Sequence, residues 1–237
     1  MLDDDITRCA APRGGESAML RSAAMPRENG VVALAPERAE EASLLLGRAF
    51  RDNPGMRAIL AEHSTDQRLR AVSRVVRGFV DATLRAGDAR VVVEAGHIAA
   101  VALAYAPGRW PASIVTQLII ARGPLTTGLR STLRFARADR IMRKRHPHRP
   151  NWYLLMLGVE PELQGKGLGS RLLAHHTASA GSDGVECYLE TDKLSSVRLY
   201  ERHGYVVTTD ETFAALGQLR LWTMTRPQGA TVVATAG

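Results

Sequence analysis

The sequence predicts a single domain of the α/β class, and two features of its pattern indicate this. Short runs rich in β-branched residues alternate with longer stretches whose apolar residues recur at helical spacing. Residues 152–159 form a continuous apolar run, typical of a strand buried on both faces, and a glycine-rich turn precedes the next helix. The 237 residues, 45% of them hydrophobic, suffice for one large core, and no internal repeat is evident.

The first half is predicted to hold a strand, two helices and a hairpin. A short strand over 31–34 precedes a helix that begins at Pro36, where the missing N–H is tolerated. The second helix ends at Gly87, and its apolar residues recur at three- and four-residue steps: Leu69, Val72, Val76, Phe79, Val80 and Thr83. Residues 90–94 and 98–105 are β-rich and separated by a short glycine-containing turn, which predicts a hairpin.

The second half is predicted to alternate helices and strands around the apolar run. Two helical stretches lead to Pro147, and the strand follows at 152–159. The remaining elements are expected as a helix from about 166 to 180, a strand at 186–190, a helix at 195–203, and strands at 205–208 and 219–225.

The two ends of the chain are expected to lie outside the domain, which is assigned to residues 31–227. Residues 1–30 mix glycine, proline and charged side chains and lack the apolar core of a signal peptide, so a disordered lead-in is predicted. Residues 228–237 are predicted to be a flexible tail. Three methionines would each serve as a start of translation: Met1, Met19 and Met25.

The cysteine content indicates a reducing compartment, whereas the net charge does not identify a binding partner. Cys9 and Cys187 are too few for a disulfide framework, which predicts two reduced thiols in a cytoplasmic protein. No apolar run approaches the roughly 18 residues that span a bilayer, so no membrane partner is expected. The net charge of +7 and the isoelectric point near 10.0 fit a protein that binds nucleic acid or a small polyanion.

The glycine-rich turn is the most informative motif. Residues 164–169 read Gln-Gly-Lys-Gly-Leu-Gly directly before a helix, so a close backbone approach and unpaired helix N–H groups form a phosphate cradle. The P-loop is excluded because Lys166 is followed by glycine rather than serine or threonine. The dinucleotide fingerprint is excluded because Gly165, Gly167 and Gly169 are evenly spaced.

Two motifs resemble the GNAT superfamily of N-acyltransferases. The pattern Gln164-x-x-Gly167-x-Gly169 resembles its acyl-CoA loop, and Tyr-Glu-Arg-His-Gly-Tyr at 200–205 resembles the element after its CoA-binding helix. Residues 148–206 are further similar to the puromycin N-acetyltransferase family. The resemblance implies a mixed, mostly antiparallel central sheet flanked by helices, with a splayed strand pair that binds acyl-CoA.

The resemblance also implies how acetyl-CoA, as co-substrate and without a metal, is held. The backbone of the strand would pair with the pantetheine arm and point an N–H at the thioester carbonyl, at Leu157, Gly158 and Val159. The pyrophosphate would bind N–H groups of Gln164, Gly165, Lys166, Gly167, Leu168, Gly169 and Ser170. Ser196 stands where the family commonly has asparagine and offers one of the two bonds of an amide. Leu199 replaces the family's usual phenylalanine.

Two side chains are the candidates for proton transfer. Tyr200 would be the general acid toward the CoA thiolate, because a thiol pKa of about 8.5 and a phenol pKa of about 10 are close. The alternative for Tyr200 is a core aromatic residue. Glu190, at the end of a strand, would orient the acceptor ammonium or take its proton through water, and its alternative is a solvated carboxylate.

The expected function is acetyl transfer from acetyl-CoA to a primary amine of a small molecule. A puromycin-like aminonucleoside is one acceptor among small amines, other antibiotics and peptide N-termini. Phe50, Trp110 and Trp152 are candidate wall residues of the acceptor site or core residues. His175 and His176 are expected on the surface, because a metal site needs further ligands.

Two other classes of function compete with this prediction. The first is a non-catalytic CoA-binding or ligand-sensing module, which the altered residue at Ser196 motivates. The second is a nucleic-acid-associated protein that uses the basic segment 122–149, where arginines line one helix face. Nucleic acid is not expected because few aromatic residues interleave this segment. A monomer and a homodimer both stay open.

Overall fold

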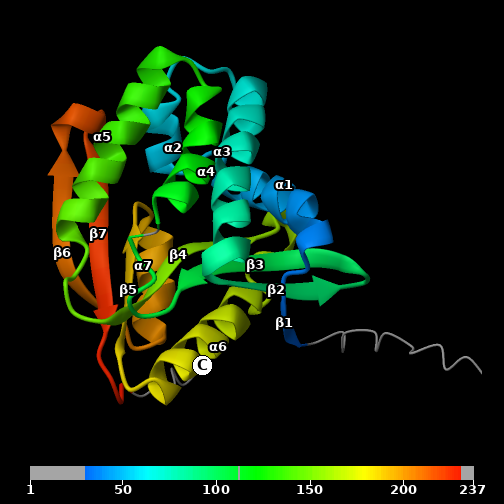
Figure 1. Cartoon of the computed structure of the whole chain (residues 1–237), viewed down its shortest axis with the longest axis vertical. Helices are drawn as coiled ribbons and strands as arrows, with labels where there is room; N and C mark the ends of the chain where they lie inside the picture. The colour runs from blue at the N-terminus through cyan, green and yellow to red at the C-terminus, as the bar shows by residue number, and fades with distance from the viewer. Residues whose placement is uncertain (1–29, 112, 231–237) are drawn as a thin grey trace, which may run out of the picture.

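The computed structural model describes residues 30–111 and 113–230. One seven-stranded sheet organises them, with the strand order β1-β2-β3-β4-β5-β7-β6 (Figure 1). Its strands are β1 (Val31–Ala33), β2 (Asp88–Glu94), β3 (His97–Tyr105), β4 (Asn151–Val159), β5 (Glu186–Thr191), β6 (Val206–Phe213) and β7 (Leu219–Arg226). Only β4 and β5 pair in parallel, so the sheet is mostly antiparallel, as predicted.

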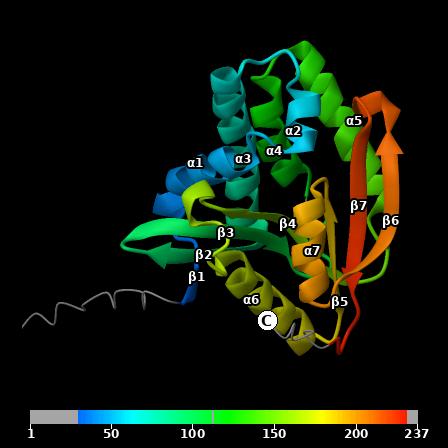
Figure 2. The ribbon, with the colours of Figure 1, turned by 180° about the vertical axis from the view of Figure 1, so that it is seen from behind.

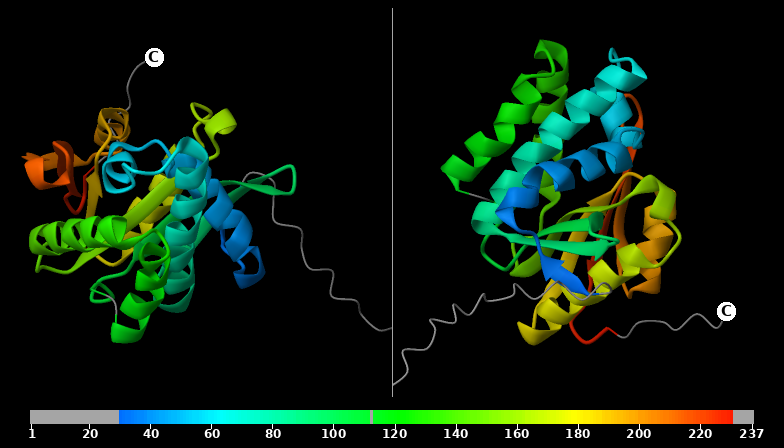
Figure 3. Two further views of the ribbon diagram at one scale, coloured as in Figure 1. Left: turned by 90° about the horizontal axis from the view of Figure 1, so that it is seen from above. Right: turned by 90° about the vertical axis from the view of Figure 1, so that its right-hand side faces the viewer.

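Helices cover both faces of this sheet. They are α1 (Ala39–Phe50), α2 (Pro54–Ile59), α3 (Thr65–Ala86), α4 (Ile114–Leu125), α5 (Leu129–Arg145), α6 (Leu168–Ser182) and α7 (Leu194–Arg202). Helices α1 and α3 lie on one side of the sheet and α6 lies on the other (Figures 1 and 3). In the part of the chain that the structure describes, no helix has the length and apolarity to cross a membrane. The predicted lead-in and tail fall almost entirely outside the described residues.

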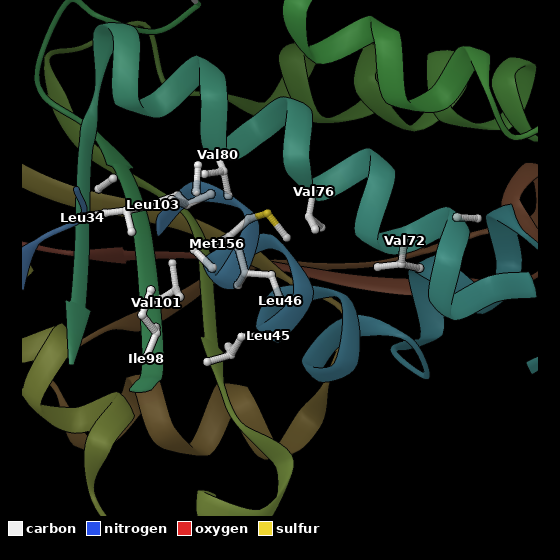
Figure 4. Packing of buried hydrophobic residues seen from close by; sticks show 14 of the residues in the cluster. Leu34, Leu45, Leu46, Val72, Val76, Val80, Ile98, Val101, Leu103 and Met156 are labelled. Atoms are coloured by element: carbon white, nitrogen blue, oxygen red, sulfur yellow. The ribbon is translucent and has the colours of Figure 1, made fainter. Parts of the chain in front are cut away.

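The sheet divides the core into two parts, and successive side chains of β3 point alternately into one part and the other. Val101 and Leu103 point toward α1 and α3, where they meet Leu46, Val76 and other residues of one buried cluster (Figure 4). Ala100, Ala102 and Ala104 point the other way, and α6 packs on these small residues with Leu168, Leu172 and Leu173. All but the first residue of β3 are therefore buried, as a central strand covered on both sides requires.

The sheet opens between β4 and β5. The two strands pair only where Asn151–Leu154 lie beside Glu186–Leu189. Beyond Leu154, β4 continues along β3 and β5 continues along β7, so the two halves of the sheet diverge (Figure 2). The predicted splayed strand pair is confirmed, and the end of β4 faces the gap.

Several elements differ from the predicted boundaries, among them α1, which begins at Ala39 rather than at Pro36, and three further differences have a physical reason. Helix α6 begins at Leu168 rather than near residue 166, because Gly165 and Gly167 are left-handed. The short helix α2 was not predicted, and Pro54 occupies its first turn, where the missing N–H is tolerated. Strand β6 extends to Phe213, because its residues pair with β7. Most of these residues are polar, so no apolar pattern predicted the extension.

Candidate active site

A cleft of about 460 Å³ opens beside the gap in the sheet. It is bounded by the ends of α1 and β4, by the start of α6 and by α7. Its lining residues are Ala49, Phe50, Asn53, Leu157, Gly158, Val159, Gln164, Gly165, Gly167, Leu168, Gly169, Ser170, Lys193, Ser195, Ser196, Leu199, Tyr200 and Arg202. The structure thus brings together the predicted strand end, the glycine loop, Ser196 and Tyr200. Lys166 is exposed on the loop and does not line the cleft.

The glycine loop leaves its backbone open beside the start of α6. Gly165 and Gly167 have φ of +81° and +80°, which side chains other than glycine rarely adopt. Neither position has an atom within 4 Å of an added Cβ, so the glycines leave open space rather than serve packing. Gly167 caps α6, whose start carries no side-chain cap. The N–H groups of residues 168–170 therefore lack intrahelical partners and meet the positive end of the helix dipole.

A different glycine, Gly158, lets α1 approach the end of β4. A Cβ at this position would lie 2.6 Å from Cδ2 of Leu46. Nearby, the guanidinium of Arg48 donates to the carboxylate of Glu160 over 2.8 and 2.7 Å. The amide of Gln164 donates to the carbonyl of Val159 over 3.3 Å. These contacts hold α1, β4 and the loop as one wall of the cleft.

Tyr200 lies at the inner end of the cleft and is buried. Its ring packs 5.7 Å from that of Tyr205, so it belongs to the core while it also lines the cleft. Burial, and next the negative charge of Asp192, raise the pKa of Tyr200 above its ordinary value. The phenol is thus held protonated, as a proton donor must be. Because its pKa is raised, Tyr200 is a weaker acid than a free phenol. The expected closeness between the pKa of the phenol and the pKa of a thiol is therefore lost.

Glu190 lies outside the cleft lining, on the face of β5 that also carries Tyr188. Its side chain is partly buried rather than solvated, so the alternative of an exposed carboxylate at the strand end is wrong. Burial raises the pKa of Glu190 to about 7, against the opposing influence of the neighbouring hydroxyl groups of Tyr153 and Tyr188. A carboxylate with a near-neutral pKa beside the gap has the property of a general base.

Asp192 is a residue of this region that sequence reasoning missed. Its carboxylate accepts a hydrogen bond from the N–H of Gly55 over 2.6 Å. A Cβ on Gly55 would lie 2.7 Å from the same oxygen, so glycine is needed for this approach. Burial raises the pKa of Asp192. No pattern links positions 55 and 192, which are 137 residues apart.

The predicted aromatic wall residues separate in the structure. Phe50 lines the cleft. Trp110 instead packs 5.1 Å from Tyr105 and 5.2 Å from Tyr153, in an aromatic cluster on the α3 side of the sheet. Trp152 lies on the opposite face and donates its indole N–H to Asp183 over 2.7 Å. Of the three, only Phe50 is placed to contact a ligand in the cleft.

The two adjacent histidines also differ from expectation. His176 is 3% exposed and packs edge-on against Trp152 at 5.7 Å, so its predicted surface position is wrong. Burial lowers its pKa to about 3, which keeps the imidazole neutral. His175 is half-buried. Within residues 30–111 and 113–230, no group of three His, Cys, Asp or Glu side chains could hold a metal ion.

The basic segment is tied to acidic residues that lie far away in the sequence. Arg134 pairs with Glu62 over 2.8 Å. Further on, Arg145 pairs with Glu211 and Arg149 pairs with Glu186. Within the segment itself, Arg143 pairs with Asp139 over 2.7 Å. These ion pairs reduce the free positive charge that a nucleic-acid surface would need.

Comparison with known proteins finds similarity to acetyltransferases. Residues 133–207 match the family model of the acetyltransferase (GNAT) domain. The chain is 39% identical over 79 residues to a mycothiol acetyltransferase of Mycobacteroides abscessus, covering 32% of this chain and 26% of that protein. A mycothiol acetyltransferase of Propionibacterium freudenreichii is 37% identical over 70 residues, covering 28% and 22%. The matched region thus spans about a quarter of these relatives.

Solved structures share the fold over most of the chain. A "histone acetyltransferase HPA2 and related acetyltransferase" of Corynebacterium glutamicum aligns with a TM-score of 0.57 and 20% identity, covering 86% of this chain and 99% of that one. Arylalkylamine N-acetyltransferase 2 of Aedes aegypti aligns with a TM-score of 0.56 and 14% identity, covering 83% and 97%. The described residues share the fold of these solved acetyltransferases, and the match to the GNAT domain model is confined to residues 133–207. The narrower resemblance to the puromycin N-acetyltransferase family stays a prediction.

Proposed function

We propose that this chain is an enzyme that transfers an acetyl group from acetyl-CoA to a primary amine of a small molecule in the cytoplasm. One observation carries the proposal: a single cleft joins the free end of β4, the anion-binding start of α6 and the protonated phenol of Tyr200. These are the three groups that a thioester donor needs: a strand for its arm, a cradle for its phosphates and a proton for its sulfur.

The chain's residues divide the binding of the donor between two elements. The N–H groups of residues 168–170, with the open left-handed glycines Gly165 and Gly167, would hold the pyrophosphate. Lys193 and Arg202 also line the cleft and add positive charge. The backbone of Leu157–Val159, which faces the gap, would pair with the pantetheine arm and polarise the thioester carbonyl.

The transfer itself needs two proton movements. The amine nitrogen attacks the thioester carbonyl carbon, the carbon–sulfur bond breaks, and the departing thiolate takes the phenolic proton of Tyr200. The acceptor nitrogen loses a proton through water to the carboxylate of Glu190, which lies outside the cleft lining and whose pKa of about 7 suits this role. The products are an acetamide and free CoA, and both protein groups return to their starting state by exchange with solvent.

We propose only the chemical class of the acceptor, which is a primary amine. The relatives named above transfer acetyl groups, and a primary amine on a small molecule, including an aminonucleoside or another antibiotic, fits an opening walled by Phe50 and Asn53. Release of free thiol from acetyl-CoA across a panel of amines tests the activity. Activity with any amine, lost in a variant of the glycine loop, supports the proposal.

A second candidate is a sensor that binds CoA without chemistry. The side chain of Ser196 lines the cleft where an amide would give two bonds, which motivates this alternative. Calorimetric titration with CoA distinguishes the two candidates. Binding of CoA with no thiol release from acetyl-CoA for any amine would favour the sensor.

A further inference from the structure

A second pocket, of about 430 Å³, opens at the end of β4 that is farther from the cleft. The cleft reaches Leu157–Val159, whereas this pocket is lined by Trp152, about 16 Å earlier along the extended strand. Helices α3 and α6 lie on opposite sides of the sheet (Figure 1), and the pocket receives residues from both. It is therefore a site separate from the cleft, and the proposed acetyl transfer makes no use of it.

Three arginines line this pocket, and we call it the arginine pocket. Arg85 comes from the last turn of α3, Arg90 from β2 and Arg109 from the turn that follows β3. Of the described residues that line the pocket, only Asp88 carries a carboxylate, and it accepts a hydrogen bond from Nε of Arg90 over 2.6 Å. Segments that are separate in the sequence thus bring three guanidinium groups to one pocket.

Two of these arginines have no acidic partner. Within residues 30–111 and 113–230, no carboxylate forms an ion pair with Arg85 or Arg109, and both residues are exposed. Asp183 lies close to the pocket, but it accepts the indole N–H of Trp152 over 2.7 Å and does not line the pocket. The guanidinium groups of Arg85 and Arg109 are therefore available to a ligand.

The charge balance of the arginine pocket is positive. Three positive charges and the single negative charge of Asp88 leave a net charge of +2 on the lining side chains. Helix α3 ends here, and its carbonyl end adds roughly half a negative charge. The pocket thus stays positive by more than one charge, and arginine keeps its charge at every physiological pH. Such a concave positive site attracts anions.

We propose that the arginine pocket binds the phosphate monoester group of a small molecule. A phosphate monoester is a dianion near neutral pH, which matches the net charge of the lining side chains. Its three terminal oxygens also accept the paired N–H groups that a guanidinium donates. The volume lies within the roughly 300–1,000 Å³ of small-molecule pockets, so the organic part has room beside the small residues Ala86, Gly87 and Ala106.

A nucleic-acid backbone and a dicarboxylate are the competing ligands. A backbone phosphate is a diester with one negative charge, and the basic helices α4 and α5 contribute no lining residue to this pocket. A dicarboxylate carries the same charge as a phosphate monoester but divides it between two separate groups. The pocket has one small basic surface, and this favours a ligand whose two charges lie on one group.

Isothermal titration calorimetry with glycerol 3-phosphate tests the proposal, at low salt so that screening is weak, and near pH 8 where the probe is a dianion. We expect a dissociation constant of about 1 mM or lower, within reach of a few charge-assisted hydrogen bonds. Glycerol should not bind, and succinate should bind at least about tenfold more weakly because its charge is divided.

Two double variants locate the binding. Arg85→Gln with Arg109→Gln should raise the dissociation constant at least about tenfold, because it removes two unpaired charges from the pocket. Arg122→Gln with Arg130→Gln removes the same charge from exposed positions of α4 and α5 and should leave the constant unchanged. Gly167→Ala, in the glycine loop of the cleft, should also retain binding of the probe.

Four results would overturn the proposal. The first is no binding of glycerol 3-phosphate at about 10 mM, an affinity too weak for a built site. The second is an equal loss in both double variants, which would indicate a general effect of net charge. The third is succinate that binds as tightly as the probe. The fourth is binding that Gly167→Ala abolishes and the pocket variant retains, which would assign it to the cleft. Circular dichroism confirms folding of each variant, and none of these measurements depends on acetyl transfer.

Discussion

The carboxylate of Asp192 accepts a hydrogen bond from the backbone N–H of Gly55 over 2.6 Å, across 137 residues of sequence. This bond ties the end of β5 to the first turn of α2, beside the cleft residue Asn53. The same carboxylate acts on Tyr200, whose pKa it helps to raise. One partly buried acid thus connects the start of α2, next to the cleft residue Asn53, with the proposed proton donor.

The bond between Gly55 and Asp192 predicts a positioning role. Gly55→Ala places a methyl group 2.7 Å from the carboxylate oxygen and must displace it, so kcat/KM should fall by at least about tenfold. Asp192→Asn keeps an oxygen acceptor but removes the charge, so the pKa of Tyr200 should fall toward its ordinary value. Ultraviolet titration of Asp192→Asn, with and without Tyr200→Phe, measures this. An unchanged Tyr200 titration would contradict the charge effect.

Tyr200→Phe is expected to lower kcat by about 10²-fold, because it removes only the proton for the thiolate. The dissociation constant of CoA should change little, since the ring that packs in the core is retained. Tyr205→Phe is the matched control, because Tyr205 packs beside Tyr200 but does not line the cleft. Equal turnover in Tyr200→Phe and wild type would remove the proposed general acid.

Glu190 should impose an acidic limb on the pH–rate profile. Its pKa is raised to about 7 by burial, so kcat/KM should rise with pH until the carboxylate is ionised near that value. Glu190→Gln should lower the plateau and abolish this limb. Tyr153→Phe removes a hydrogen bond that lowers the pKa of Glu190, so it should move the limb to higher pH. A limb that survives in Glu190→Gln would assign it to another group.

The burial of Glu190 also predicts that the folded protein loses stability over the pH range in which activity rises. The folded-state pKa of Glu190 lies above its ordinary value of 4.5, so its contribution is fully present below pH 4.5 and is lost as pH rises through about 7. The loss is on the order of 3 kcal/mol. Glu190→Gln cannot ionise, so its unfolding free energy should lose less between pH 4.5 and 8 than that of the wild type. Denaturant titrations at several pH values measure the difference.

The left-handed glycines of the loop should be sensitive to substitution for conformational reasons. Gly165→Ala and Gly167→Ala force an L side chain to φ near +80° and should each cost about 1 kcal/mol of stability. The CoA dissociation constant should rise by about tenfold or more, because the N–H groups lose their alignment. Gly181→Ala, in α6 with open space around it, should leave both quantities unchanged or improve stability. Calorimetry and thermal unfolding separate these outcomes.

Much of the architecture could be predicted from local pattern. The apolar spacing of the second helix, the turn between the hairpin strands and the doubly apolar strand at 152–159 correspond to α3, β2–β3 and β4. The spacing of the glycines at 165–169 also excluded two known phosphate-loop motifs. This was possible because the left-handed backbone of the loop requires glycine, and glycine can be recognised in the sequence. These features depend on residues close in sequence, and so their signal is contained in short windows.

Other features depend on contacts between distant segments. The burial of His176 beside Trp152 follows from the packing of α6 on the sheet, and the neutralisation of Arg134 by Glu62 follows from the docking of α5. Periodicity identifies the residues that share a helix face, but it does not identify what that face meets. The same limit explains why the exposed side of α4 can be identified only in the structure.

The sequence by itself determined the order of the elements other than α2, the spacing of the glycine loop and the candidacy of Tyr200, because each is written in adjacent residues. The tertiary structure alone decided that the separation of β4 and β5 begins after Leu154, that Asp192 meets Gly55, and that Glu190 is buried enough to titrate near neutral pH. Each of these arises where chain segments far apart in sequence exclude water from one another, and desolvation of that kind has no signature in a single stretch of residues.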